Sequence, residues 1–156
     1  MRTNMKKLLS VLFLGSALVL TGCGDTEESA EGELQDGTYR IEELNFGSTG
    51  WKEALEIVVD GGAITDANFE SVNEDDVNKI EDEDYQETMT NVSGTGPQDF
   101  IPELEEQIVG MEKPSDVEVV TGATSTSEKV QEWAEELYSA AEEGNTDTIE
   151  VDNQDE

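Results

Sequence analysis

The chain contains no histidine and a single cysteine. Without histidine there is no Ser/His or Cys/His nucleophilic machinery, which excludes hydrolases of that kind. The sequence also has no CxxC pair and no cluster of histidines, so the usual ligands of a zinc site are missing. A lone cysteine cannot form an intrachain disulfide. These absences argue against a hydrolytic or zinc-dependent enzyme.

Basic residues are also scarce. Eight Lys and Arg stand against 39 Asp and Glu, for a formal net charge of −31. A surface of this kind repels phosphate backbones and anionic lipid headgroups. We therefore expect neither nucleic acid nor anionic lipid headgroups as directly contacted partners.

The densest acidic run lies at residues 74–84. Carboxylate oxygens are the ligands that calcium prefers. However, the run lacks the glycine at the sixth loop position and the acid spacing of an EF-hand. We interpret it as a solvated loop that leads into a helix, and we predict no metal site.

The first 22 residues have the pattern of a signal peptide. Three basic residues precede an apolar run at residues 8–19, which is shorter than the roughly 20 residues of a membrane span. Leu20-Thr21-Gly22-Cys23 resembles the lipobox of bacterial lipoproteins, in which the cysteine is diacylated. This resemblance implies lipidation of Cys23 and a place on the extracellular face of the cytoplasmic membrane. The mature chain would carry a net charge of about −34.

Composition divides the rest of the chain into three parts. Residues 24–36 include one large apolar side chain, so we predict that 23–36 is the lipidated cysteine followed by an extended acidic tether. Residues 37–144 contain the periodic apolar patterns of a folded domain. Residues 145–156 are polar and acidic, which predicts a disordered tail.

The folded part is predicted to be α+β, with a small antiparallel sheet and two to three helices packed on one side. Asp60-Gly61-Gly62 joins two strand-like runs and is typical of a tight hairpin. A further strand is expected at the beginning of the folded part, from Thr38, and a short strand is expected at residues 117–120. Apolar spacing predicts helices over 85–90, 97–109 and 130–141.

One stretch, Thr121-Gly122-Ala123-Thr124-Ser125-Thr126-Ser127-Glu128, is predicted to be a strand-to-helix corner. Gly122 permits a positive φ, and Ser125 with Glu128 matches the Ser/Thr-x-x-Glu capping box. A helix start presents free N–H groups and a positive dipole end, which suit a phosphate. On these residues alone, the corner either holds a phosphoryl group or only caps a helix.

The sequence of this stretch resembles the flavinylation signature Asp-x-x-(Ser/Thr)-Gly-Ala-Thr of FMN-binding domain proteins. The family includes flavin-carrying subunits of sodium-pumping and Rnf-type redox complexes and small lipoproteins of extracellular electron transfer. The resemblance implies that Thr124 receives FMN from FAD in phosphodiester linkage, through a separate Mg-dependent flavin transferase. The residues implied to surround this cofactor are Thr121, Gly122, Ala123, Ser125, Thr126 and Glu118.

The resemblance extends from about Asp36 to Gly144, through the Gly-Thr-Tyr opening, the Asp-Gly-Gly-x-Ile hairpin and the helix near Pro97. One position departs from the family, because Glu118 stands where the signature has Asp. The carboxylate is kept but lies one methylene further from the backbone. Possible stacking partners for the flavin ring are the aromatic residues Tyr39, Phe46, Trp51, Tyr85 and Phe100.

Two functions follow from these observations. The first is a membrane-anchored flavoprotein that passes electrons from a membrane quinone or flavoprotein to an outside acceptor, as a carrier and substrate of the transferase rather than an enzyme. The second, suggested by charge and anchor alone, is an acidic surface lipoprotein that binds cations or a protein partner.

Overall fold

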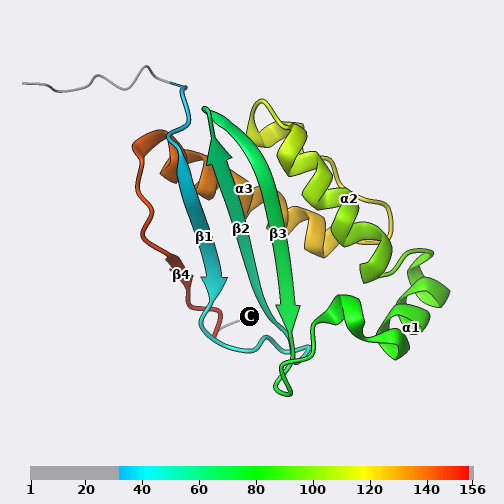
Figure 1. The fold of residues 1–156 in the computed structure, drawn as a ribbon. Helices are drawn as coiled ribbons and strands as arrows, with labels where there is room; N and C mark the ends of the chain where they lie inside the picture. The colour runs from blue at the N-terminus through cyan, green and yellow to red at the C-terminus, as the bar shows by residue number, and fades with distance from the viewer. Residues whose placement is uncertain (1–31, 155–156) are drawn as a thin grey trace, which may run out of the picture.

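A computed structural model describes residues 32–154, and these residues form the predicted α+β fold (Figure 1). The signal peptide, Cys23 and most of the predicted tether lie outside the described residues. The elements in chain order are β1 (Gly37–Glu43), β2 (Lys52–Asp60), β3 (Ala63–Val72), the 3-10 turn η1 (Lys79–Glu81), α1 (Glu83–Ser93), α2 (Pro97–Gly110), the 3-10 turn η2 (Pro114–Asp116), α3 (Thr124–Glu143) and β4 (Ile149–Val151).

The sheet has the strand order β3-β2-β1-β4. β1, β2 and β3 pair antiparallel, whereas β4 lies parallel to β1 at the edge, so the sheet is mixed rather than purely antiparallel. The hairpin between β2 and β3 is confirmed, because Gly61 and Gly62 both have positive φ, of 64° and 77°. Only residues that tolerate this region make so tight a turn without strain.

A bulge in β3 changes the face on which its side chains lie. The register shifts at Val58 and Val59, whose partners in β3 are Asp66 and Ile64. The extra residue brings both Ile64 and Ala67 to the buried face, three positions apart, where strict alternation would separate them. β3 therefore contributes a continuous apolar row to the core.

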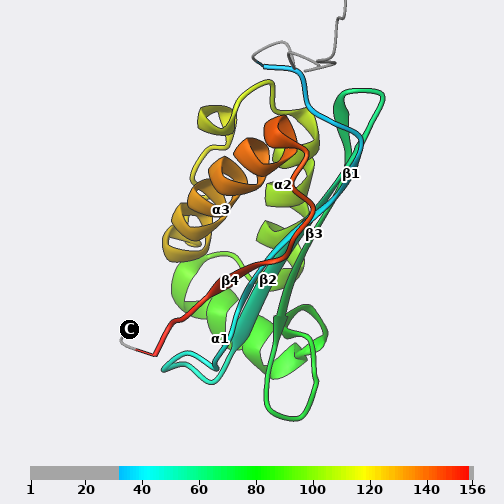
Figure 2. The same cartoon turned by 90° about the vertical axis from the view of Figure 1, so that its left-hand side faces the viewer.

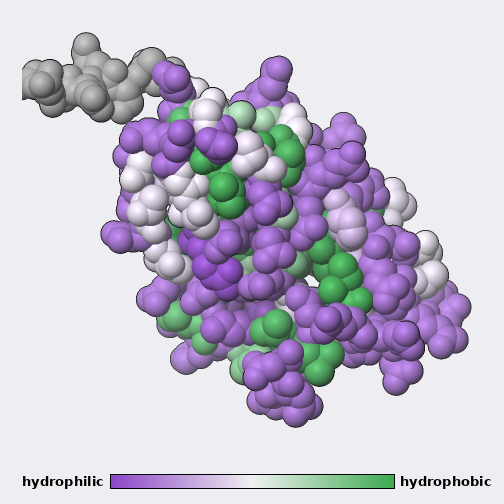
Figure 3. Space-filling view, in the orientation of Figure 1, coloured by the Kyte–Doolittle hydropathy of each residue, from purple (hydrophilic) through white to green (hydrophobic). Residues whose placement is uncertain are grey.

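The helices α1, α2 and α3 lie on one side of the sheet (Figure 2). α2 packs against β3, and α3 lies across β1 and β2. The large side chains sealed between these layers are Tyr39, Ile41, Leu55, Ile57, Phe100, Ile101, Leu104, Ile108, Val117, Val130 and Leu137. The opposite face of the sheet is turned toward solvent and is largely hydrophilic (Figure 3). None of the helices within residues 32–154 has the length and apolar content needed to cross a bilayer.

Two predictions about the chain ends are wrong. Leu34, the one large apolar residue of the predicted tether, is buried in the core, and the Gln35 amide donates to the Ala141 carbonyl at 2.9 Å. The folded body therefore begins before residue 37. Residues 149–151 of the predicted disordered tail instead form β4, in which Ile149 and Val151 are half-buried against the core. Both segments are ordered by pairing with distant residues, which their own composition does not reveal.

The predicted strand at residues 117–120 is also absent. This segment is extended but pairs with no strand of the described chain. Side chains hold it instead: the Glu118 amide donates to Gln107 at 2.6 Å, and Gln131 donates to the Val117 carbonyl at 2.5 Å. The corner before α3 is therefore a coil-to-helix corner. The acidic run at 74–84 leads through η1 into α1, as predicted.

Candidate functional site

α3 begins at Thr124, so the hydroxyl singled out from the sequence lies in the first residue of the longest helix. Ala123 precedes it as the N-cap and makes no side-chain capping bond. The amides of the first turn are therefore not bonded to an N-cap side chain. Thr124 itself is exposed, with its side chain at the surface rather than in the core.

The predicted capping box between Ser125 and Glu128 does not form, because the helix starts two residues earlier than that box requires. Ser127 orders the turn instead. Its Oγ accepts a hydrogen bond from the Val120 amide at 3.0 Å and donates to the Ala123 carbonyl at 2.8 Å. This fully buried hydroxyl closes the stretch on itself. A serine inside a helical pattern carries no sequence signal for such a role.

Gly122 lets the segment before α3 pack closely against the end of α1. Its φ of 89° is the positive value predicted for this position. A side chain here would also collide with the Ser93 carbonyl oxygen and press on Thr95, in the connection between α1 and α2. Glycine is therefore required twice, for the conformation and for the close approach. The start of α3 is held next to the end of α1.

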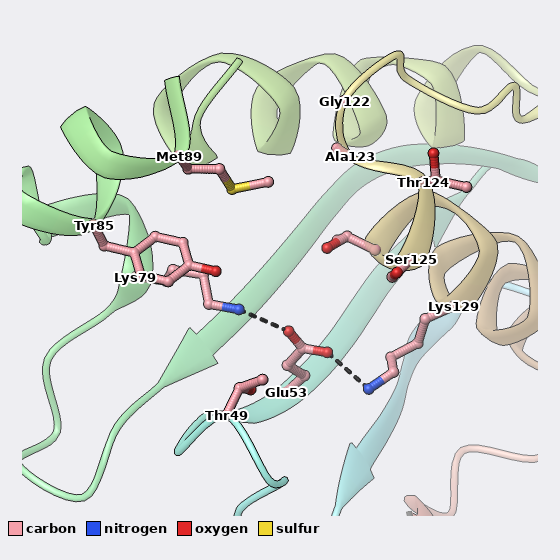
Figure 4. A pocket seen from close by; sticks show the side chains of 11 residues that line it. Thr49, Glu53, Lys79, Tyr85, Met89, Gly122, Ala123, Thr124, Ser125 and Lys129 are labelled. Atoms are coloured by element: carbon pink, nitrogen blue, oxygen red, sulfur yellow. Dashed lines mark hydrogen bonds and ion pairs between the residues drawn. The ribbon is translucent and has the colours of Figure 1, made fainter. Parts of the chain in front are cut away.

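Thr124 opens onto a cavity of about 470 Å³ between α1, β2 and the first turn of α3 (Figure 4). A volume of this size is within the usual range for a small-molecule site. The lining residues are Thr49, Glu53, Lys79, Tyr85, Met89, Gly122, Ala123, Thr124, Ser125, Thr126 and Lys129. Five of the predicted site residues are thus brought together, at positions 122–126. Thr121 and Glu118 are exposed and do not line the cavity.

The floor of the cavity comes from the inner face of the sheet. On β2 the alternation that buries Ile57 and Leu55 carries Glu53 to the same face. Glu43 and Ser71 occupy the equivalent inward positions on β1 and β3, beside Glu53. At this end of the sheet the inward row changes from apolar to polar. Of this patch Glu53 lines the cavity together with Thr124, and it was not predicted as part of the site.

Two lysines neutralise the buried carboxylates. The Glu53 carboxylate lies 3.0 Å from the Lys79 ammonium and 2.9 Å from the Lys129 ammonium. The two lysines approach it from opposite sides (Figure 4). Lys129 also reaches Glu43 at 2.6 Å. Within the described chain, no buried side-chain nitrogen or oxygen is left without a hydrogen-bond partner. The network is complete, as a buried group of charges must be.

The ion pairs shift the pKa values of Glu53 and Lys129 from their ordinary values. Burial by itself would raise the pKa of Glu53, but the charges of Lys79 and Lys129 outweigh it and hold this pKa below its ordinary value. Burial likewise acts to lower the pKa of Lys129, and hydrogen bonds to Glu43 and Glu53 raise it instead. Both groups are therefore charged at neutral pH.

The FMN-binding domain family matches residues 50–139, a span that includes all the cavity-lining residues except Thr49 and more than half of the chain. The chain belongs to this family. It is 32% identical over 116 residues to the 15 kDa lipoprotein of Treponema pallidum (strain Nichols). The matched region covers 74% of this chain and 82% of that protein. A crystal structure of a Clostridium perfringens protein shares 41% identity and a TM-score of 0.72, over 76% of this chain and 98% of that one. The family resemblance is confirmed.

The aromatic residues of this FMN-binding domain divide into two groups. Tyr39 and Phe100 are each only 1% exposed in the core, so neither can contact a flavin ring. Tyr85 lines the cavity, and Trp51 packs behind it edge to face, with ring centroids 5.5 Å apart. Phe46 is exposed and lies outside the cavity wall. Among the five aromatic candidates, Tyr85 alone is placed to cover a ring.

The residues around the cavity fit FMN. A phosphate is suited by the amide groups at the start of α3, beside the exposed Thr124 hydroxyl. A flat ring is suited by Tyr85 and Met89, one helical turn apart on α1. No group of three or more Asp, Glu, Cys or His able to hold a metal ion is found among residues 32–154.

Proposed function

We propose that this protein is a lipid-anchored flavoprotein that carries FMN covalently on Thr124. In this function it passes electrons from a membrane quinone or flavoprotein to an acceptor outside the cytoplasmic membrane. The observation that carries the proposal is the position of Thr124, exposed at the start of α3 and open to a cavity of flavin size. Family membership supplies the cofactor.

The attachment reaction needs a separate enzyme. Thr124 Oγ forms a bond to the phosphorus of the FMN half of FAD, the phosphoanhydride bond breaks, and AMP leaves. The hydroxyl proton goes to a base of the Mg-dependent transferase. A threonine hydroxyl is a poor nucleophile without such a base. The chain has no histidine, and Glu53, the carboxylate that lines the cavity, is engaged by two lysines.

A covalent link also solves a binding problem. The strongly acidic chain repels a free phosphorylated ligand, and cofactor outside the cell is dilute. Even a nanomolar site, worth about 12 kcal/mol, empties when the ligand falls far below its dissociation constant. Once attached, FMN supplies the redox chemistry, and the protein supplies position and electrostatics. Tyr85 and Met89 would shield one side of the ring from water.

The anchor rests on the sequence and on a relative. Cys23 follows an apolar segment with a lipobox-like end, and both lie outside the described residues. The Treponema pallidum relative is named a lipoprotein. Acyl chains on Cys23 would hold the domain at the outer surface of the cytoplasmic membrane, each buried CH₂ contributing about 0.8 kcal/mol.

Coexpression with a flavin transferase tests the proposal. Intact mass spectrometry of the full chain from membranes should show one FMN adduct in the wild type and none in Thr124→Ala. The adduct should remain in Thr126→Ala, which removes a neighbouring hydroxyl of the same cavity. An adduct that persists in Thr124→Ala would place the attachment elsewhere. Unmodified wild-type protein would favour the acidic binding lipoprotein instead.

A further inference from the structure

Positive charge in this molecule is concentrated at the cavity. Five basic residues occur in residues 32–154, and they are Arg40, Lys52, Lys79, Lys113 and Lys129. Two of the five, Lys79 and Lys129, line the cavity together with one acid, Glu53. With Glu43, which bonds to Lys129 beside the lining, two lysines balance two carboxylates here, in a chain whose net charge is −31.

Lys79 is held in place more firmly than an ordinary lysine. Only 6% of Lys79 is exposed, although it lies within the acidic run at residues 74–84. The ammonium lies 5.0 Å from the centre of the Trp51 ring and 5.6 Å from that of Tyr85, and it bonds to Glu53 at 3.0 Å. Contacts with ring faces and a carboxylate together fix the position of the charge.

We propose that Lys79 and Lys129 raise the reduction potential of the flavin carried by Thr124, and that Glu53 limits this effect as their counter-ion. This inference rests on the proposed function. Reduction adds negative charge to the ring system, which nearby ammonium groups favour and nearby carboxylates oppose. The charges act across a partly enclosed cavity, where water and salt screen them less than at the surface.

The proposal predicts that substitutions of Lys79 and Glu53 shift the reduction potential of the flavin in opposite directions. Lys79→Gln removes a positive charge from the cavity and lowers the potential, whereas Glu53→Gln leaves both lysines without their shared partner and raises it. Lys113→Gln is the matched control, because it removes the same charge from a side chain that is 70% exposed and lies outside the cavity. Its potential should stay close to the wild-type value.

The measurement is a spectroelectrochemical titration of each flavinylated full chain, in low salt and in about 1 M salt. At a fixed electrode potential, Lys79→Gln should change the ratio of oxidised to reduced flavin by on the order of tenfold, about 30 mV for a two-electron couple. Glu53→Gln should shift the ratio the other way. Both shifts should persist at high salt. Equal shifts in Lys79→Gln and Lys113→Gln, or equal signs in Lys79→Gln and Glu53→Gln, would overturn the inference.

Folding defects are controlled by a second variant. Lys129→Gln alters a side chain that is 29% exposed, against 8% for that of Lys79, and it should also lower the potential. A wild-type-like potential in folded Lys129→Gln contradicts the inference. Intact mass separates the two proposals: absence of the adduct in the wild type removes the proposed function, whereas an adduct with an unchanged potential in every variant removes only this inference.

Discussion

On the outer face of the sheet Arg40 pairs with three glutamates, whereas on the inner face Glu53 pairs with two lysines. The outer distances are 2.9 Å to Glu42, 3.7 Å to Glu56 and 3.1 Å to Glu70, and all four side chains are about a third exposed. The inner pairs are as short, but the Glu53 side chain is only 11% exposed. Both groups are ion pairs between carboxylates and basic side chains, but the outer pairs are exposed to water and the inner pairs are buried.

This difference decides what each group of charges does. Exposed pairs are screened by water and salt, and each contributes about 0–1 kcal/mol to stability. A buried pair gains little over an apolar core, yet removing one partner leaves an uncompensated charge that costs about 3–5 kcal/mol. The outer charges can therefore change with little effect. The inner ones are tied both to the fold and to the cavity below Thr124.

The largest contrast is expected between two glutamates on β2. Glu53→Gln should lower the free energy of unfolding by about 3–5 kcal/mol, because Lys79 and Lys129 lose their shared buried partner. Glu56→Gln, three residues away on the outer face, should change it by less than about 1 kcal/mol. Urea unfolding of unmodified protein measures both. Equal losses would show that the faces do not differ in solvation.

A smaller contrast is expected with pH. The pKa of Glu53 is lowered in the fold, so its stabilisation is present above its ordinary value of 4.5 and is lost as pH falls through the folded value. The stability difference between wild type and Glu53→Gln should therefore shrink below about pH 4.5.

The alkaline side has the opposite sign. The pKa of Lys129 is raised above its ordinary value of 10.5, so its contribution is present below pH 10.5 and is lost as pH rises through the folded value. Unfolding of wild type and Lys129→Gln across the pH range checks this. A difference from Lys129→Gln that grows above that pH contradicts the assigned pairing.

The smallest effect is expected on the outer face. Arg40→Gln removes three exposed ion pairs, each worth about 0–1 kcal/mol, and should cost less in dilute buffer than Glu53→Gln does. In about 1 M salt, where the Debye length is near 3 Å, the cost should fall further. Thermal unfolding at the two salt concentrations measures it. A loss as large as that of Glu53→Gln, unchanged by salt, would remove the distinction between the faces.

Local patterns predicted much of the molecule. Gly61 and Gly62 marked the hairpin, the apolar spacing marked all three helices, and the wording around Thr124 led to the family. Each of these signals lies within a few residues of the feature it predicts. Predictions failed where order depends on distant partners, as for Leu34 and for β4, which pairs with β1.

The sequence by itself determined the α+β class, the family and the hydroxyl that begins the last helix. Only the tertiary structure decided that Glu53 of β2 pairs with both Lys79, from the acidic run, and Lys129, in the cavity that Thr124 also lines. In the sequence, Glu53 is one of 39 acids, and Lys79 has acids on both sides. Their role follows from burial and charge pairing, which exist only once three distant segments have packed together.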